Sequence, residues 1–282
     1  MPELPEVEVA SRNLRRWMDG RKLLAVEPLE GSKRIFRPAA ASAMDALVGA
    51  RFRDVRRVGK NILMTLDTRS GPAGLWSHLG LTGKWVHRAA GTPEPPFARV
   101  AIELDDQSWL YYVDTRIFGR LRVVPGAAFE EIPEISALGP DPLTDGIDAR
   151  ELHAKLAKIS KPIKVAIMDQ ALLPGIGNIQ AIEGLHRAGI DPRRPAKSLS
   201  QADVNHLRKG LLDSIEFTLA SFASDGADGG ANDITYVEER RSPNPFLIYG
   251  RKGEPCPRCK KGVITRIVQA QRATYFCPNC QK

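Results

Sequence analysis

The chain has 282 residues, of which 43% are hydrophobic and 26% are charged, a composition typical of a globular protein with room for two domains. No run approaches 18 apolar residues, which excludes a membrane-spanning helix. The acidic start, interrupted by two prolines, argues against a secretory signal, so we expect a cytoplasmic protein.

The positive charge is concentrated at the C-terminal end. The net charge is +8, and residues 240–282 carry +9 from ten Lys/Arg and one Glu, which leaves −1 for the remainder. Such a segment favours a polyanionic partner, most simply nucleic acid. Basic tails also serve solubility, and charge alone does not separate the two interpretations.

The chain begins "MPELPEVEVA", and apolar residues at helical spacing predict a helix over Pro5–Met18. Proline suits the first position of a helix, and acidic residues suit its positively polarised end, which accounts for Glu6 and Glu8. This interpretation leaves Pro2 and Glu3 unexplained.

Pro2 and Glu3 have a possible chemical use. Because initiator methionine is normally removed before a small residue, we expect the mature chain to start at Pro2 with a free secondary amine. Such an amine titrates near pH 8 and is partly nucleophilic at neutral pH. Its adduct with a sugar aldehyde carbon is an iminium that stays cationic, and Glu3 could move protons beside it.

Short β-type runs follow the helix, with a turn signal at residues 105–107. Many strands without crossover helices predict an antiparallel sandwich or barrel. The expected strand regions are 23–29, 51–67, 74–88 and 99–124.

A segment rich in Pro, Gly and Asp places a domain boundary near residues 130–147. Helical patterns follow, with a glycine break "PGIGN" at 174–178 and a helix capped by Ser200 and Asp203. Residues 224–245 lack apolar periodicity and predict a loop. The expected helical regions are 148–159, 161–173, 179–190 and 200–222.

Four cysteines form the pattern C-x2-C-x17-C-x2-C near the C-terminus: Cys256, Cys259, Cys277 and Cys280. This spacing is typical of a tetrahedral four-thiolate zinc site, with a β-hairpin between its halves. Two disulfides are the alternative, which a cytosolic chain disfavours. With four sulfur ligands the zinc has no open position and is expected to be structural.

Four motifs together resemble the formamidopyrimidine-DNA glycosylase family: "PELPEVE", "GIGNIQAIEGL", "YGRKGEPC" and "QRATYFCPNCQK". The resemblance runs from Pro2 to Lys282. It implies an α+β multidomain fold: an N-terminal antiparallel β-sandwich with flanking helices (2–135), a helix–two-turn–helix domain with a lesion-capping loop (136–245), and a C-terminal zinc-finger β-hairpin (246–282).

The resemblance also implies residue roles. Pro2 is the expected nucleophile, Glu3 the acid/base at the sugar, and Glu6 their support. Lys60 is the expected phosphate contact and elimination lysine, although it could be an ordinary exposed cation. The expected DNA contacts are His78, Arg116, Lys164, Asn178, Tyr249 and Arg272. The residues expected to fill the gap left by a flipped nucleotide are Leu81, Arg116 and Phe118.

Four features depart from the family pattern. Leu81 stands where methionine is usual, and Gln180 replaces an aromatic residue. The spacing between the cysteine pairs is one residue longer than the commonest form. Residues 224–245 lack the expected "DGxxGxF" pattern of the capping loop, which bears on the lesion preferred.

The resemblance implies a bifunctional DNA repair glycosylase and abasic-site lyase. It would excise 8-oxoguanine and formamidopyrimidines from double-stranded DNA through a Pro2 iminium and β,δ-elimination, as a bacterial, nucleoid-associated monomer with one structural zinc ion. An endonuclease VIII-like enzyme preferring oxidised pyrimidines is the first alternative. The second is a zinc-ribbon DNA-binding protein without catalysis, for which an unblocked Pro2 would have no use.

Overall fold

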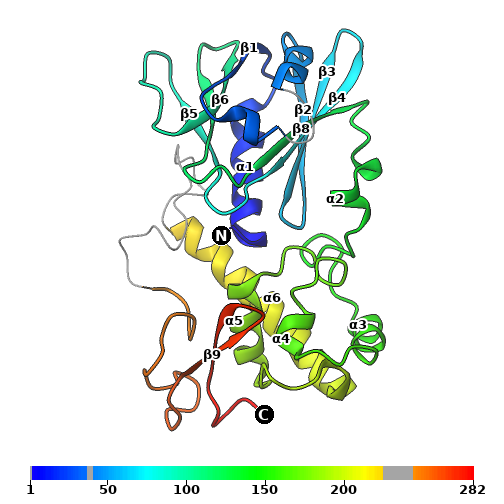
Figure 1. Ribbon diagram of the computed structural model, residues 1–282, viewed down its shortest axis with the longest axis vertical. Helices are drawn as coiled ribbons and strands as arrows, with labels where there is room; N and C mark the ends of the chain where they lie inside the picture. The colour runs from blue at the N-terminus through cyan, green and yellow to red at the C-terminus, as the bar shows by residue number, and fades with distance from the viewer. Residues whose placement is uncertain (1, 37–40, 225–243) are drawn as a thin grey trace. The chain divides into compact units, whose positions relative to one another are not determined.

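The computed structural model describes residues 2–36, 41–224 and 244–282 (Figure 1). By their internal contacts, the described residues divide into two compact units. The N-terminal unit contains residues 2–36, 41–136 and 222–224, and the second unit contains residues 137–221 and 244–282. No helix within these described ranges has the length and apolarity needed to cross a bilayer.

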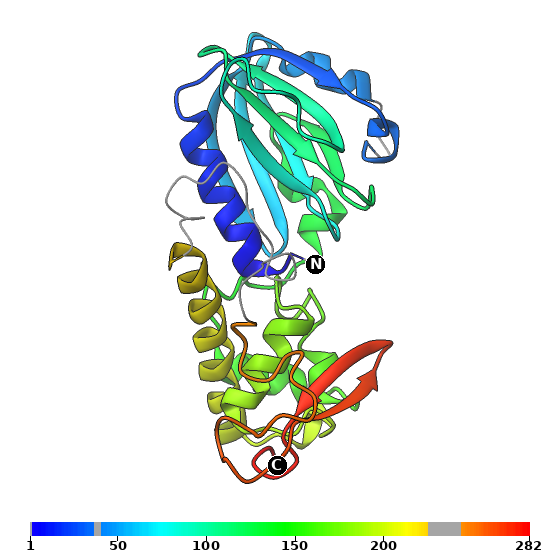
Figure 2. The ribbon, with the colours of Figure 1, turned by 90° about the vertical axis from the view of Figure 1, so that its left-hand side faces the viewer.

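The N-terminal unit contains two four-stranded antiparallel sheets, which confirms the predicted sandwich (Figure 2). The first sheet has the order β1 (Leu23–Pro28), β6 (Ala98–Leu104), β7 (Trp109–Val113) and β5 (Lys84–Arg88). The second has the order β2 (Arg51–Val58), β3 (Asn61–Thr68), β4 (Gly71–His78) and β8 (Arg120–Pro125).

Aromatic side chains join the two sheets through the core. Trp85 and Tyr112 are fully buried and meet edge to face, with ring centroids 5.1 Å apart. Trp85 Nε1 donates to Ser77 Oγ at 3.1 Å, and the Tyr112 hydroxyl donates to the carbonyl of His78 at 3.2 Å. Both bonds run between sheets, so the sandwich is fixed by directional contacts as well as by apolar burial.

Helix α1 (Leu4–Met18) packs against β2 and β5, which are edge strands of the two different sheets (Figure 2). Its apolar stripe is buried at Val7, Ala10 and Leu14. The helix therefore covers an open side of the sandwich, and its N-terminal turn is held by that packing.

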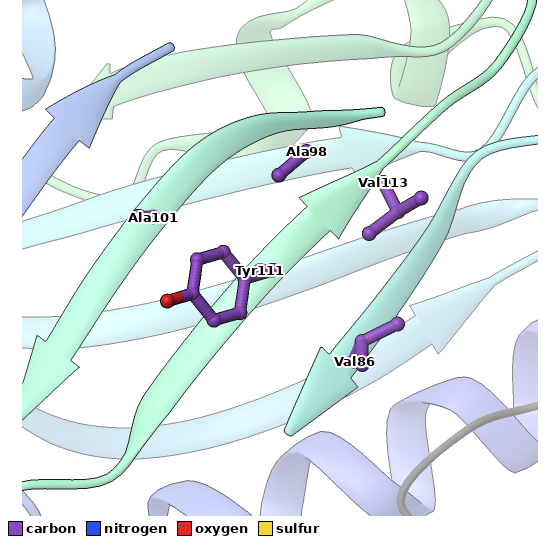
Figure 3. Packing of buried hydrophobic residues seen from close by; sticks show 5 residues of the cluster. All are labelled: Val86, Ala98, Ala101, Tyr111 and Val113. Carbon is purple, nitrogen blue, oxygen red and sulfur yellow. The ribbon is translucent and has the colours of Figure 1, made fainter. Parts of the chain in front are cut away.

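A smaller apolar cluster lies on the other face of the β5–β6–β7 sheet (Figure 3). Alternate residues of a strand point to opposite faces, so this cluster lies behind Trp85 and Tyr112. Its members are Val86, Ala98, Ala101, Tyr111 and Val113. The short elements of this unit are η1 (Ser32–Arg34), η2 (Ala41–Leu47), η3 (Phe129–Glu131) and α2 (Pro133–Ser136).

The second unit is helical and ends in a two-stranded sheet, as predicted. The Ser200–Asp203 capping box is present, with Asp203 N–H donating to Ser200 Oγ at 3.1 Å. The elements are α3 (Ala149–Leu156), α4 (Ile163–Ala166), α5 (Asn178–Ala188), η4 (Ala196–Ser198), α6 (Gln201–Ser224, whose residues 222–224 are counted with the N-terminal unit), β9 (Thr265–Gln269) and β10 (Arg272–Phe276).

One helix prediction was wrong. Residues 161–173 form only the single turn of α4 and then continue as turns. Side chains replace the helical hydrogen bonds there: Asp169 accepts from Ala171 N–H, and Gln170 bonds to the backbone of Met168, Gly175 and Ile176. Such local bonds compete with a helix, and apolar spacing does not reveal them.

Candidate functional site

The first turn of α1 gathers two buried carboxyl groups directly after Pro2. Pro2, Glu3 and Glu6 are all buried, and Glu3 N–H donates to Glu6 Oε2 at 2.9 Å. Burial, together with the negative charge of Glu3, raises the pKa of Glu6 to about 7. Glu6 therefore exchanges a proton near neutral pH, which suits it to supporting proton transfer at Pro2 and Glu3.

Lys60 lies in the two-residue turn between β2 and β3, where Gly59 has a φ of 59°. Arg57, which is buried, donates from Nε to Glu8 Oε2 at 2.8 Å and from Nη1 to the Gly59 carbonyl at 3.0 Å. Because Glu8 belongs to α1, this ion pair connects the helix that follows Pro2 to the turn that carries Lys60.

Sheet register brings three basic residues to one end of the β3–β4–β8 sheet. Asn61, which follows Lys60, pairs with His78, and His78 pairs with Arg120. Burial, and then the charges of Lys60 and Arg120, lower the pKa of His78 to about 4. His78 Nδ1 accepts from Gly80 N–H at 3.1 Å, so the neutral ring carries its proton on Nε2 and can act as a donor there.

Lowering the pH should destabilise the folded protein, because His78 is buried in its neutral form. The ordinary pKa of His78 is 6.5 and its pKa in the folded protein is about 4. Between pH 6.5 and pH 4, His78 is therefore protonated in the unfolded chain but neutral in the folded one. Stability should therefore fall as pH drops through this window, by up to about 3 kcal/mol from His78. In urea titrations at pH 7 and pH 4, a His78→Asn variant should lose less stability than the parent; equal losses would contradict the assignment.

The three residues expected to fill the gap in DNA lie on two loops of the N-terminal unit. Leu81 is half-buried in the loop between β4 and β5, while Arg116 and Phe118 are exposed in the loop between β7 and β8. The Phe118 side chain is 53% exposed, and the Arg116 guanidinium lies 5.1 Å from the centre of its ring. An exposed aromatic ring with a stacked cation suits insertion between base pairs.

Two expected DNA contacts of the second unit are bonded to each other. Lys164 is buried, and its Nζ donates to Asn178 Oδ1 at 2.5 Å. Asn178 Nδ2 donates to the carbonyl of Ala273, the residue after Arg272 on β10, at 3.0 Å. The structure therefore brings Lys164, Asn178 and the strand of Arg272 together, and Lys164, which is fully buried, reaches only as far as Asn178 among the expected DNA contacts for which a bond is described.

Arg272 is exposed beside the tip of the C-terminal hairpin. The tip consists of Ala270 and Gln271, both with positive φ (46° and 60°), and Arg272 pairs with Gln269 across it. Non-glycine residues in this conformation are strained, and such strain concentrates at functional positions.

Tyr249, an expected DNA contact, has both of its main-chain polar groups bonded inside the protein. Its N–H donates to Glu183 Oε1 at 3.0 Å, and its carbonyl accepts from Asn244 Nδ2 at 2.6 Å. Its ring packs edge to face on Tyr275. A DNA contact by the Tyr249 backbone would compete with these bonds.

Sequence reasoning missed Glu183. This buried carboxylate on α5 accepts backbone N–H groups from Leu247, Ile248 and Tyr249 at 2.9 to 3.1 Å. It anchors the segment that leads into the cysteine-rich region. Its position in "IEGLH", on the apolar side of a helix, was the available signal, since a buried Glu requires partners.

The four cysteines converge as a tetrahedral site requires. Their sulfur atoms all lie within 4.8 Å of one another, and the Cys256–Cys280 and Cys259–Cys277 sulfurs are 3.7 Å apart. A tetrahedron with zinc–sulfur bonds of about 2.3 Å has an edge of about 3.8 Å, so the group fits zinc.

Nitrogen atoms lie close to two of the four sulfurs. Gly262 N–H and Asn279 Nδ2 reach Cys259 Sγ at 3.4 and 3.3 Å, and His186 Nε2 lies 3.4 Å from Cys256 Sγ. Such donors stabilise thiolate ligands. His186 belongs to α5, so the zinc site is tied to the helix that begins at Asn178.

Family models match the chain in three consecutive blocks. They describe the formamidopyrimidine-DNA glycosylase N-terminal domain over residues 1–121, the H2TH domain of the same glycosylase over residues 138–224, and a zinc finger found in FPG and IleRS over residues 253–282. The chain belongs to the formamidopyrimidine-DNA glycosylase family.

Curated relatives and solved structures agree with this family assignment. A formamidopyrimidine-DNA glycosylase of Rhodospirillum centenum is 36% identical, with both chains fully covered. One of Symbiobacterium thermophilum is 37% identical over this whole chain and 89% of its own. The Lactococcus lactis enzyme in complex with Fapy-dG-containing DNA has a TM-score of 0.83 at 26% identity, covering 99% of this chain and all of its own.

The departure at Gln180 has a structural explanation. Its Nε2 donates to Thr218 Oγ1 at 3.0 Å, and its Oε1 accepts from Ser214 Oγ at 2.7 Å. All three side chains are buried, so a satisfied polar cluster between α5 and α6 stands where this family usually places an aromatic ring. The predicted capping loop lies mostly outside the described residues.

Proposed function

We propose that this family member excises oxidised purines, such as 8-oxoguanine and formamidopyrimidines, from double-stranded DNA and cleaves the strand at the resulting abasic site. The observation that carries the proposal is the buried Glu3–Glu6 pair immediately after Pro2, with the pKa of Glu6 raised to about 7. A helix capping box accounts for the bond between Glu3 and Glu6, but a protein that only binds DNA has no use for a carboxyl group with a pKa near 7 close to a terminal secondary amine.

In the proposed reaction, the Pro2 nitrogen attacks C1′, forming an N–C1′ bond while the C1′–base bond breaks. The base leaves with the electron pair and is protonated, and the amine loses its proton. Protonation of O4′, assisted by Glu3, opens the sugar ring to a cationic iminium. Loss of a C2′ proton expels the 3′ phosphate, loss of a C4′ proton expels the 5′ phosphate, and water releases Pro2.

The remaining sequence-predicted residues have proposed roles around this chemistry. Lys60, His78, Asn178 and Arg272 would contact phosphates, with Lys164 orienting Asn178, and Tyr249 would add a contact through its side chain. Leu81, Arg116 and Phe118 would fill the gap left by the flipped nucleotide. The four-cysteine zinc site would stiffen the hairpin that presents Arg272.

The proposed preference for purines follows the name shared by the relatives. A solved Lactococcus lactis complex contains Fapy-dG, and another contains an oxidised pyrimidine, so the pyrimidine alternative needs its own measurement. Duplexes carrying each lesion in the same sequence context separate the two. Release of the pyrimidine lesion alone would contradict the purine proposal.

Borohydride trapping tests the catalytic assignment directly. Incubating the untagged protein with a duplex containing an abasic site and sodium borohydride should reduce the iminium to a stable protein–DNA adduct. Mass spectrometry should place the adduct on Pro2 of a chain lacking Met1. If no adduct forms, the non-catalytic zinc-ribbon alternative is favoured instead.

Arg272→Ala should weaken DNA binding across sequences because it removes one phosphate contact. The slope of log affinity against log salt should become shallower by about one unit. Fluorescence anisotropy over a salt series measures both. The matched control is Lys209→Ala, which makes the same change in net charge at a residue that forms an ion pair with Asp213. An unchanged salt slope for Arg272→Ala would mean that Arg272 does not contact phosphate.

We further propose that the domains are residues 2–135, 136–245 and 246–282, which accommodates the three matched blocks. A monomer suffices for the proposed reaction. We place the enzyme in the bacterial cytoplasm, where DNA affinity would associate it with the nucleoid.

A further inference from the structure

A buried carboxylate, Asp114, lies between the two loops expected to enter DNA. These are residues 79–83, which carry Leu81, and residues 114–119, which carry Arg116 and Phe118. Asp114 is 0% exposed. Its place at the end of β7 puts it at the root of the second loop.

Its two oxygen atoms bind donors from both loops. Asp114 Oδ1 accepts from Thr82 Oγ1 at 2.5 Å and from Arg116 N–H at 3.1 Å. Asp114 Oδ2 accepts from Gly119 N–H at 2.8 Å. Charge-assisted bonds of this kind are shorter and stronger than neutral ones, and their loss leaves buried donors unsatisfied.

The two loops approach each other closely at Gly80, where a Cβ would lie 2.5 Å from the carbonyl of Phe118. Each loop also packs a glycine on the Tyr112 hydroxyl of β7: a Cβ on Gly83 or Gly119 would lie 2.2 or 1.8 Å from it. Between Arg116 and Phe118, Ile117 has a φ of 56°. The carboxylate therefore holds a close contact between loops and a strained backbone at the same place.

We propose that Asp114 is a positioning residue that joins the Leu81 loop to the Arg116–Phe118 loop as one preformed wedge. The inference rests on the proposed function of these loops in filling the gap. Leu81 and the Arg116–Phe118 pair come from different strand connections, so independent loops would each have to be ordered when DNA binds. Fixing them beforehand removes that cost from the flipping step.

The wedge should affect activity only on a duplex substrate, in which a flipped nucleotide leaves a gap. A duplex lesion leaves a hole when its nucleotide is flipped, whereas an abasic single strand has no stacked neighbour pair to hold open. Asp114→Asn keeps the side-chain shape but replaces one acceptor oxygen by an NH₂ donor facing another donor. We expect it to lower kcat/KM on the duplex lesion about 10- to 100-fold. Trapping on the abasic single strand should stay within about twofold of the parent.

A second readout needs no catalysis. With 2-aminopurine placed opposite the lesion, insertion of the wedge should raise fluorescence in the parent and much less in Asp114→Asn. Thr82→Val removes only the bridging hydroxyl and should reproduce the defect if Asp114→Asn folds poorly. Thr82→Ser keeps the hydroxyl and should behave as the parent.

Two results would overturn the wedge proposal. One is an equal loss of kcat/KM on the duplex lesion and of trapping on the abasic single strand in Asp114→Asn. The other is an unchanged 2-aminopurine response in both Asp114→Asn and Thr82→Val. Failure of the parent to trap either substrate would refute the proposed chemistry instead. The fluorescence comparison would still decide the role of Asp114.

Discussion

Insertion of a single glycine ahead of Pro2 is expected to abolish covalent trapping and strand cleavage. The insertion converts the Pro2 nitrogen into an amide, which has no nucleophilic lone pair to give to C1′, and moves the terminal amine, now the primary amine of the inserted glycine, one residue away from that position. Removing a nucleophile typically costs about 10⁴-fold or more in rate. Borohydride trapping and gel assays of cleavage measure the loss, after mass spectrometry confirms the chain's first residue.

DNA affinity should survive this insertion, because the expected phosphate contacts lie elsewhere in the chain. Anisotropy with a duplex containing an uncleavable abasic analogue should give a dissociation constant within about threefold of the parent. Pro2→Gly is the matched control, since it changes the same residue and retains a terminal, primary amine; it should trap slowly but detectably. Normal trapping by the glycine-insertion variant would exclude Pro2 as the nucleophile.

Removal of zinc should have the second large effect, through the hairpin that carries Arg272. Structural zinc contributes on the order of 10 kcal/mol to the folding of small zinc-finger peptides, and residues 253–282 offer little other core. The buried apolar side chains of this region are Ile264, which packs with Ile182 and Ile248, and Phe276. We expect a chelator, or Cys259→Ser, to weaken duplex binding at least about 10-fold.

The effect of zinc loss should be confined to the second unit, and the chain supplies its own control. All four tryptophans, Trp17, Trp76, Trp85 and Trp109, lie in the N-terminal unit. Tryptophan fluorescence should therefore stay unchanged while zinc release, followed with a coloured chelator, parallels the loss of DNA affinity. Zinc release without loss of affinity would show that the hairpin does not need the metal for binding.

The features that sequence reasoning recovered are local ones. The zinc site follows from two pairs of cysteines with fixed spacing, and the capping box of α6 follows from Ser200 and Asp203, three residues apart. The sandwich follows from strand runs separated by turn residues. In each case the determining residues are neighbours in the sequence, so their spacing already carries the geometry.

The features that the sequence did not predict depend on partners that are distant along the chain. Glu183 binds backbone groups 64 to 66 residues away, and Asp114 binds Thr82, 32 residues away. Gln180 was noted only as a departure, because its partners Ser214 and Thr218 become neighbours when α5 packs on α6. A polar residue in an apolar stretch signals a buried partner, but the fold alone identifies it.

The ion pair between Glu8 and Arg57 has a consequence for how temperature acts on the N-terminal unit. Because it clamps the start of α1 to the hairpin bearing Lys60, thermal fraying of that helix end is coupled to loosening of the turn. Both should exchange their amide hydrogens through one shared opening event. A substitution that weakens the ion pair at Glu8 or Arg57 would then disorder the surroundings of the Pro2 amine and of Lys60 together, at temperatures where the sandwich itself is still folded.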